Sequence, residues 1–277
     1  MSTIPSHIAW LYDTGQRVTT SEGRKIAVLG IKHLEDAAII SAWAKHFREH
    51  YHLDATLDEA RDGTGLSRKD YLEQLVFPHK SNAPGPSIRA GDFAEILVAD
   101  YFEYALKWRV PRTRYRAKAV PNESVKGTDF LAFGITQATD LQAQKYSADD
   151  VLMSVEVKAQ FTGSSAKARL QDAIDDSAKD RLRRAFTLNA MKQRLRSDKD
   201  NDGVALVRRF QSEADHPFKS QYTATAVYCE SVYDPTQVGN VSVVDHPDNP
   251  SLSLFVLKGE QMMALVHHLY EVAANEA

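Results

Sequence analysis

An acidic residue and a lysine, two positions apart on a strand-like segment, could together support the hydrolysis of a phosphodiester. Residues 152–161 read LMSVEVKAQF, and alternate side chains of a strand point to opposite faces of its sheet. One face would be apolar throughout, and the other would carry Glu156 and Lys158 side by side. The triplet Glu156-Val157-Lys158 alone could arise by chance, so its place on a strand with an apolar reverse face is what makes it informative.

Two further acidic residues precede this strand. Asp129 opens a short apolar strand predicted over residues 128–135, and Glu95 lies on a helix predicted over residues 88–106. A carboxylate at the start of an apolar strand costs free energy unless a cation faces it. Mg²⁺ or Mn²⁺ on such carboxylates could activate a water, which Lys158 would orient or deprotonate. The alternative is an exposed ion pair on the edge of a sheet.

Hydrophobic periodicity places these residues in a mixed sheet flanked by helices. From residue 88 on, the predicted order is α-β-β-β-α-β-β-α, and interleaved elements of this kind predict an α/β (α+β) fold. The predicted strands cover residues 113–120, 128–135, 151–161, 221–232 and 252–257, and the predicted helices cover residues 88–106, 167–195 and 260–274.

A loop rich in Pro, Gly, Asn and Ser, FPHKSNAPGPS at residues 77–87, separates this core from a smaller N-terminal region. The patterns in that region predict a strand over residues 25–34 and helices over 35–51 and 67–77. We therefore expect an N-terminal α/β region, residues 1–86, and a main domain, residues 87–277.

Composition and charge narrow the class of protein. The formal net charge is −3, from 34 basic and 37 acidic residues, so nucleic acid would have to be held by a local patch or by a partner. The single cysteine, Cys229, excludes an intramolecular disulfide and a cysteine-based zinc site, and it fits a reducing compartment. No apolar run approaches the roughly 20 residues of a membrane helix. Residues 1–21 have no apolar run behind basic residues, so we expect no signal peptide. We expect a cytoplasmic protein with no membrane partner.

The acidic residues and the lysine occur in a familiar order. Glu95 on a helix, then Gly127-Thr128-Asp129, then Glu156-Val157-Lys158, resembles the PD-(D/E)xK nuclease superfamily, whose shared core is α-β-β-β-α-β. The resemblance covers residues 88–232. It implies a restriction-endonuclease-like fold and a Mg²⁺- or Mn²⁺-dependent deoxyribonuclease.

The resemblance also assigns roles. Asp129 and Glu156 would bind the metal, and Glu95, Lys158 and Gln160 would complete the catalytic set, with Gln160 at a position where related nucleases often carry a polar residue. Thr128 replaces the proline that the superfamily has before its aspartate. The Gln-x-x-x-Tyr element of RecB-type exonucleases is absent from the following helix.

Longer segments are similar to a particular family. GDFAEILVADYFE, KGTDFLAFG and VEVKAQ resemble HamA, the nuclease subunits of the Hachiman antiphage defence system, which pair with a helicase subunit. This similarity implies a helicase or ATPase partner. Because Trp43, Phe47 and Tyr51 are bulky for a small lobe, we expect residues 1–86, with part of the helix at 260–274, to dock onto that partner. The alternative is that this lobe only covers one face of the sheet.

A basic segment directly precedes the Asp129 strand. Residues 107–118 read KWRVPRTRYRAK, with six basic residues, no acid and two aromatic rings. Basic side chains meet phosphates and aromatic rings stack on bases, although charge also protects the edge of a sheet. The predicted DNA-binding residues are Arg109, Arg112, Arg114, Arg116 and Lys118.

Two other motifs have simpler interpretations. His46-Phe47-Arg48-Glu49-His50 matches the H-x-x-E-H pattern of zinc proteases, but no third ligand is identifiable, which favours half-buried helix histidines. Asp198 to Gly203 matches the first half of an EF-hand loop, whose twelfth position should be Glu and is Arg209 here. That mismatch favours an acidic turn.

Three functions remain open to this sequence. The first is a metal-dependent DNA nuclease, and the second is a catalytically inactive nuclease-fold subunit that binds DNA or a partner protein. The third, a protease built on the histidine helix, has the least support. The intact set of Asp129, Glu156 and Lys158 favours the nuclease.

Overall fold

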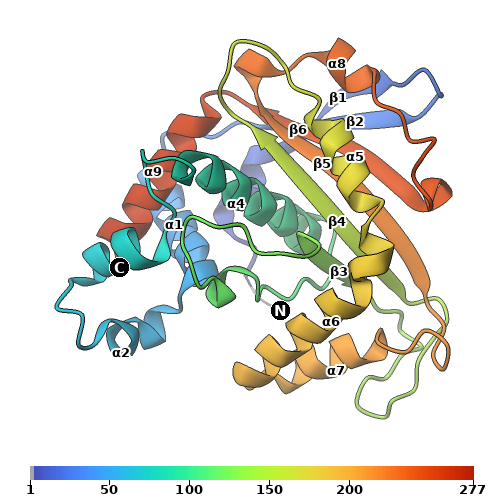
Figure 1. The fold of residues 1–277 in the computed structure, drawn as a ribbon, viewed down its shortest axis with the longest axis horizontal. Coiled ribbons are helices and arrows are strands. Elements are labelled where there is room, and N and C mark those ends of the chain that lie inside the picture. Colours follow the sequence, from blue (N-terminus) through green and yellow to red (C-terminus); the bar gives the residue numbers. More distant parts are fainter. Residues whose placement is uncertain (1–2) are drawn as a thin grey trace.

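One six-stranded sheet runs through residues 3–277, which are the residues described by the computed structural model (Figure 1). The strand order is β1-β2-β6-β5-β4-β3. The four inner strands are parallel, and the two edge strands, β1 and β3, are antiparallel to their neighbours. The strands are β1 (Leu11–Thr19), β2 (Lys25–Ile31), β3 (Phe130–Gly134), β4 (Val151–Gln160), β5 (Lys219–Cys229) and β6 (Leu252–Gly259).

Helices cover both faces of this sheet (Figure 1). α1, α4 and α9 share one hydrophobic core with one face, whereas α5, α6 and α7 pack on the other face. The expected mixed sheet flanked by helices is therefore confirmed. The helices are α1 (Ala37–Tyr51), α2 (Leu57–Arg61), α3 (Arg68–Tyr71), α4 (Gly85–Asp100), α5 (Arg169–Ser177), α6 (Asp180–Ser197), α7 (Asn201–Arg209), α8 (Pro235–Gly239) and α9 (Met262–Asn275).

β4 has the two faces that its sequence predicts. Val155 and Val157 are buried in the core beneath α4, and Glu156 and Lys158 point to the opposite face. That opposite face is covered rather than open, because α5 packs against β4 and β5. Glu156 is consequently only 2% exposed.

The strand expected over residues 113–120 is wrong. This stretch is irregular, with one 3₁₀ turn at Tyr115–Ala117, and only Arg109 forms an isolated bridge with Phe133 of β3. Pro111 has no N–H to donate to a sheet, and the Arg114 guanidinium donates to the carbonyls of Thr128 and Val125. These contacts hold the segment as a loop over the edge of β3.

The structure differs from the expectation over residues 167–195 and over the segment that resembles an EF-hand loop. The single helix predicted over residues 167–195 is divided into α5 and α6, whose apolar side chains belong to two separate cores. The EF-hand alternative is wrong, because α7 is helical from Asn201 and the Asp200 side chain caps it by accepting from the Gly203 N–H.

The first 86 residues contribute to the same sheet. β2 pairs in parallel with β6, and α1 packs against α9 near the other end of the chain. The functional division at residue 86 stays a prediction. No helix in the described residues is long and apolar enough to cross a membrane.

A buried arginine holds the start of β4 in place and gives a prediction for stability. Arg209 is fully buried, its Nε lies 2.8 Å from Asp150 Oδ2, and its other N–H groups donate to three backbone carbonyls. Arg209→Met should lower the free energy of unfolding by about 3–5 kcal/mol, because Asp150 would stay buried without its cation. Urea unfolding measures this. Arg208→Met, at the exposed neighbouring position, is the control, and equal losses in the two variants would contradict the prediction.

Candidate active site

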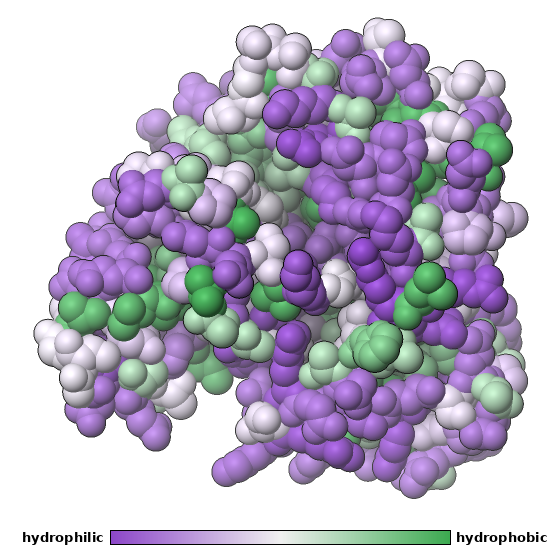
Figure 2. All heavy atoms as spheres, viewed as in Figure 1, coloured by the Kyte–Doolittle hydropathy of each residue, from purple (hydrophilic) through white to green (hydrophobic). Residues whose placement is uncertain are grey.

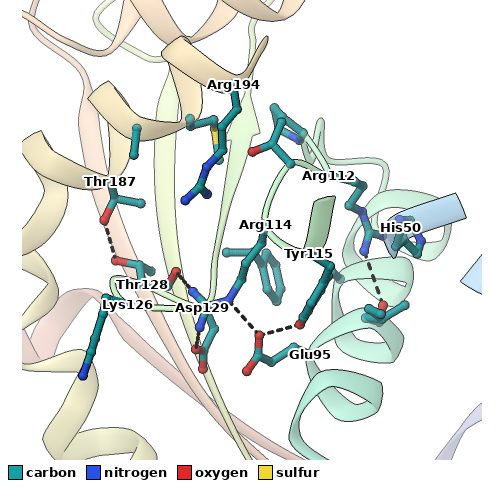
Figure 3. Close-up of a pocket in the computed structure, with 17 residues that line it drawn as sticks. His50, Glu95, Arg112, Arg114, Tyr115, Lys126, Thr128, Asp129, Thr187 and Arg194 are labelled. Atoms are coloured by element: carbon teal, nitrogen blue, oxygen red, sulfur yellow. Dashed lines mark hydrogen bonds and ion pairs between the residues drawn. The ribbon is translucent and has the colours of Figure 1, made fainter. Parts of the chain in front are cut away.

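A cleft of about 700 Å³ opens between α4, β4 and the start of α6. It is lined by four of the predicted catalytic residues, and a smaller hollow, shown in Figure 3, adjoins it and shares Glu95 and Asp129. The four predicted catalytic residues that line the cleft are Glu95, Asp129, Glu156 and Lys158, and the predicted DNA-binding residue Arg114 lines it as well.

Strand pairing brings the two central carboxylates together. Phe130 of β3 is opposite Val155 of β4, so Asp129 immediately before β3 lies beside Glu156. The Val157 N–H donates to Asp129 Oδ2 over 2.9 Å, which fixes that carboxylate against the β4 backbone. Both residues are buried.

A third carboxylate, Asp180, joins them from the start of α6. Its Oδ1 accepts from Thr128 Oγ1 at 2.8 Å, and its Oδ2, like Glu156 Oε1, is buried with no hydrogen-bond partner among residues 3–277. Burial, together with Asp129 and Asp180, raises the pKa of Glu156 to about 11. Burial also raises the pKa of Asp180 to about 6. Asp180 is not among the site residues that the sequence predicts.

Lys158 reaches the same cleft and is held by an acid of α5. Its Nζ lies 2.7 Å from Asp176 Oδ2 and 3.7 Å from Glu156 Oε2. The Lys158 side chain is one quarter exposed. Its ammonium group therefore faces the open cleft while its position is set by Asp176.

Arg114 forms ion pairs with both Glu95 of α4 and Asp129 before β3 (Figure 3). Its Nε lies 3.1 Å from Glu95 Oε2, and its Nη2 lies 3.0 Å from Asp129 Oδ1. Tyr115 also donates its hydroxyl to Glu95. Burial raises the pKa of Glu95 to about 8, although Arg114 opposes this shift.

Gln160 is not brought to the cleft. Its amide nitrogen donates to the Ser165 carbonyl over 2.8 Å, and its amide oxygen accepts from the Lys167 N–H. These contacts organise the loop between β4 and α5. The structure gives Gln160 a place in that loop, away from the three carboxylates.

Most of the basic segment is paired with internal acids. Arg112 contacts Asp100 and Glu103, and Lys118 contacts Asp92. Arg114 is paired as described above, Arg116 forms an ion pair with Asp198, and Arg109 is exposed. The predicted DNA-binding role of these five residues stays a prediction, but four of them have few N–H groups left for phosphates.

Three other cations along the cleft and the hollow have no ion pair within the described part of the chain. Lys126 and Arg183 line the main cleft, and Arg194 reaches from α6 into the adjoining hollow (Figure 3). Phe186 lies on the cleft rim and is 80% exposed. The face seen in Figure 2 is mostly hydrophilic, with hydrophobic side chains in small groups rather than in one broad patch.

The carboxylate cluster fits a divalent cation. The three carboxylates are buried close together, and two of their oxygen atoms accept no hydrogen bond. Hard oxygen ligands of this kind are those that Mg²⁺ and Mn²⁺ prefer. Without a cation, burial and the neighbouring carboxylates favour the protonated forms of Glu156 and Asp180, whose pKa values are both raised.

The mixed sheet and its acidic cleft are consistent with a PD-(D/E)xK nuclease-like fold. A family model described as HamA matches residues 6–273, nearly the whole chain, and the chain belongs to the HamA family. Membership associates the chain with the Hachiman antiphage defence system. No match was found among curated proteins.

A second set of ligand-type side chains lies on the α1 side of Arg112. His46, His50 and Asp100 are close enough together to hold a metal ion. The sequence pattern indicated no third ligand for the histidine pair. Asp100 supplies one from the end of α4, about 50 residues away in the chain.

Proposed function

We propose that this chain is a metal-dependent DNA nuclease and the effector of a Hachiman defence complex in the cytoplasm, where it works with a helicase subunit. The observation that carries the proposal is the pair of unpartnered oxygens, Glu156 Oε1 and Asp180 Oδ2, beside a cleft that Glu156 and Lys158 line. Buried carboxylates without donors are costly unless a cation binds there.

The acids, the lysine and the arginine described above would have separate roles in phosphodiester hydrolysis. Asp129, Glu156 and Asp180 would hold Mg²⁺ or Mn²⁺, which when bound supplies a Lewis acid for the phosphate and lowers the pKa of a water. Lys158, positioned by Asp176, would orient the attacking water and stabilise negative charge on the phosphate. Arg114 would keep Asp129 in place through its ion pair.

Incubation with DNA tests the proposal. Supercoiled and linear DNA are incubated with the chain in Mg²⁺, in Mn²⁺ and in EDTA, with and without the helicase subunit. Cleavage that requires the divalent metal supports the nuclease. Co-purification of the two subunits in size-exclusion chromatography tests the partner.

The alternative is an inactive subunit that binds DNA or a partner. The position of Arg114 favours this alternative. The Arg114 guanidinium contacts Glu95 and Asp129, and its positive charge could take the place of a metal ion there. Specific DNA binding without cleavage under any of these conditions, with the helicase present, would support the inactive subunit and contradict the nuclease.

The unpaired cations of the cleft give a prediction for DNA binding. Replacing Lys126, Arg183 and Arg194 together by Gln should weaken binding and flatten its salt dependence. The slope of log K against log salt should change by about 0.9 for each duplex phosphate that the variant no longer neutralises. Fluorescence anisotropy in EDTA at several NaCl concentrations measures the slope.

A matched triple variant controls for the overall loss of charge. Lys69, Lys145 and Arg208 are exposed cations that do not line the cleft, and their replacement by Gln removes the same formal charge. Equal slopes for the two triple variants would place the DNA elsewhere on the molecule.

A further inference from the structure

Three ligand-type atoms from two helices face one another beside the Arg112 end of the small hollow. His46 Nε2 lies 3.2 Å from His50 Nε2 and 3.1 Å from Asp100 Oδ1, and His50 Nε2 lies 3.9 Å from the same oxygen. The two histidines are one turn apart on α1, which places them on one side of the helix. Figure 3 shows His50 beside Arg112, at the end of the hollow away from Lys126.

Hydrogen bonds among these three atoms cannot all be made at once. Each neutral imidazole carries a hydrogen on one of its two nitrogens, and an ionised carboxylate only accepts. If the His46 Nε2 hydrogen points to Asp100, then His50 Nε2 must share that hydrogen or oppose it with its own. If His50 donates to His46 instead, the contact between His46 and Asp100 has no hydrogen. A cation between the three atoms would satisfy all three lone pairs at once.

The spacing suits a tetrahedral ion. Zinc binds imidazole nitrogen and carboxylate oxygen at about 2.0–2.2 Å, which puts neighbouring ligand atoms of a tetrahedral site about 3.3–3.5 Å apart. The separations of 3.1, 3.2 and 3.9 Å bracket this value. Two histidines four residues apart and a carboxylate from another helix are also a ligand set typical of zinc rather than of Mg²⁺.

Two neighbouring side chains hold the Asp100 carboxylate in place, as residues around a metal ligand usually do. His7 Nε2 lies 3.0 Å from Asp100 Oδ2, and Arg112 Nη2 lies 2.7 Å from Oδ1. Hydrogen bonds of this kind fix the orientation of a ligating carboxylate. Arg112 also contacts Glu103, so the two acids and one arginine leave one negative charge to be balanced. One fifth of the His46 side chain is exposed, which gives solvent access to the cluster.

We propose that His46, His50 and Asp100 bind one zinc-type transition-metal ion that fastens α1 to the end of α4. Asp100 follows Glu95 by five residues on α4, so the ion would hold the helix that presents an acid to the cleft. The site is separate from the carboxylate cluster. It does not depend on the nuclease proposal.

Metal binding by the whole chain, purified without a histidine tag, tests this site. After equilibration with Zn²⁺ in a large excess of Mg²⁺, which would fill the carboxylate cluster, and after gel filtration, elemental analysis should find one zinc per chain. Co²⁺ in place of Zn²⁺ should give the intense visible absorption of a tetrahedral site. A chain that takes up neither ion overturns the proposal without reference to any variant.

Variants locate the ion. His46→Gln and His50→Gln should each lose the Co²⁺ spectrum and the bound zinc, whereas His33→Gln and His268→Gln, at one partly exposed and one exposed histidine, should keep both. Glu156→Gln should also keep both, because it changes only the carboxylate cluster. Retention of the ion in His46→Gln, checked as folded by circular dichroism, or its loss in Glu156→Gln, overturns the assignment.

Discussion

Glu156→Gln is expected to lower the rate of DNA cleavage at least about 1,000-fold, which corresponds to a loss of about 4 kcal/mol of transition-state stabilisation. The amide keeps the shape of the carboxylate but removes the charge that would hold the metal beside Asp129 and Asp180. Lys158→Met should have a similar effect, because it removes the cation that faces the cleft. Conversion of plasmid DNA in Mg²⁺, followed on gels over time, measures both rates.

Glu59→Gln is the matched control, since Glu59 is an exposed acid on α2. It should cleave DNA at the wild-type rate. Wild-type cleavage by Glu156→Gln would remove this residue from the site, and with it the nuclease proposal in its present form. Raising the Mg²⁺ concentration should not rescue cleavage by the Glu156→Gln variant. The lost carboxylate also sets the geometry of the other two ligands, Asp129 and Asp180.

Gln is a better probe than Ala at this position. The alternation of β4 puts Glu156 on the polar face of the strand, where the sequence predicts that truncation would leave no cavity. The structure buries this face beneath α5 and the start of α6, so Ala would leave a void and uncover the polar groups nearby. A loss of activity in the Ala variant would then mix two causes.

The sequence could predict the residues of β4 and Asp129 because they depend on local patterns. Period-two alternation identifies β4, and the preceding strand in the chain, β3, is its neighbour in the sheet. Asp180 could not be predicted in this way, since its position depends on where α5 ends and α6 begins. That break follows from packing against two separate cores, which a single helical periodicity does not reveal.

Charged residues were harder to place than apolar ones. The alternating basic residues after Lys107 are typical of a strand edge, yet Arg114 and Lys118 find their partners on α4, about 20 residues earlier in the chain. β1 was missed altogether, because it is a polar edge strand with Gly15 in its middle and few apolar residues. The class of fold was predictable because it depends on the buried strands.

The contribution of the cleft acids to the stability of the metal-free protein is expected to fall as the pH rises from 5 to 8. Glu156 and Glu95 have folded-state pKa values of about 11 and about 8, above the ordinary value of 4.5, and Asp180 has a value of about 6 against 3.8. A raised folded-state pKa stabilises the protein fully below the ordinary value, and this stabilisation is lost as pH rises toward the folded-state value. Glu156 alone should contribute on the order of 1 kcal/mol per pH unit over this range.

Comparison with Glu156→Gln isolates this contribution, because every other titrating group is common to both proteins. In urea unfolding with EDTA at pH 5, 6, 7 and 8, the variant should become the more stable protein, by a margin that grows with pH. Added Mg²⁺ should restore the wild type at pH 8, since it binds the deprotonated acids of the folded state. It should do little for the variant. Parallel pH profiles in EDTA would mean that Glu156 is ionised in the folded protein, and that the cleft already contains the cation it needs.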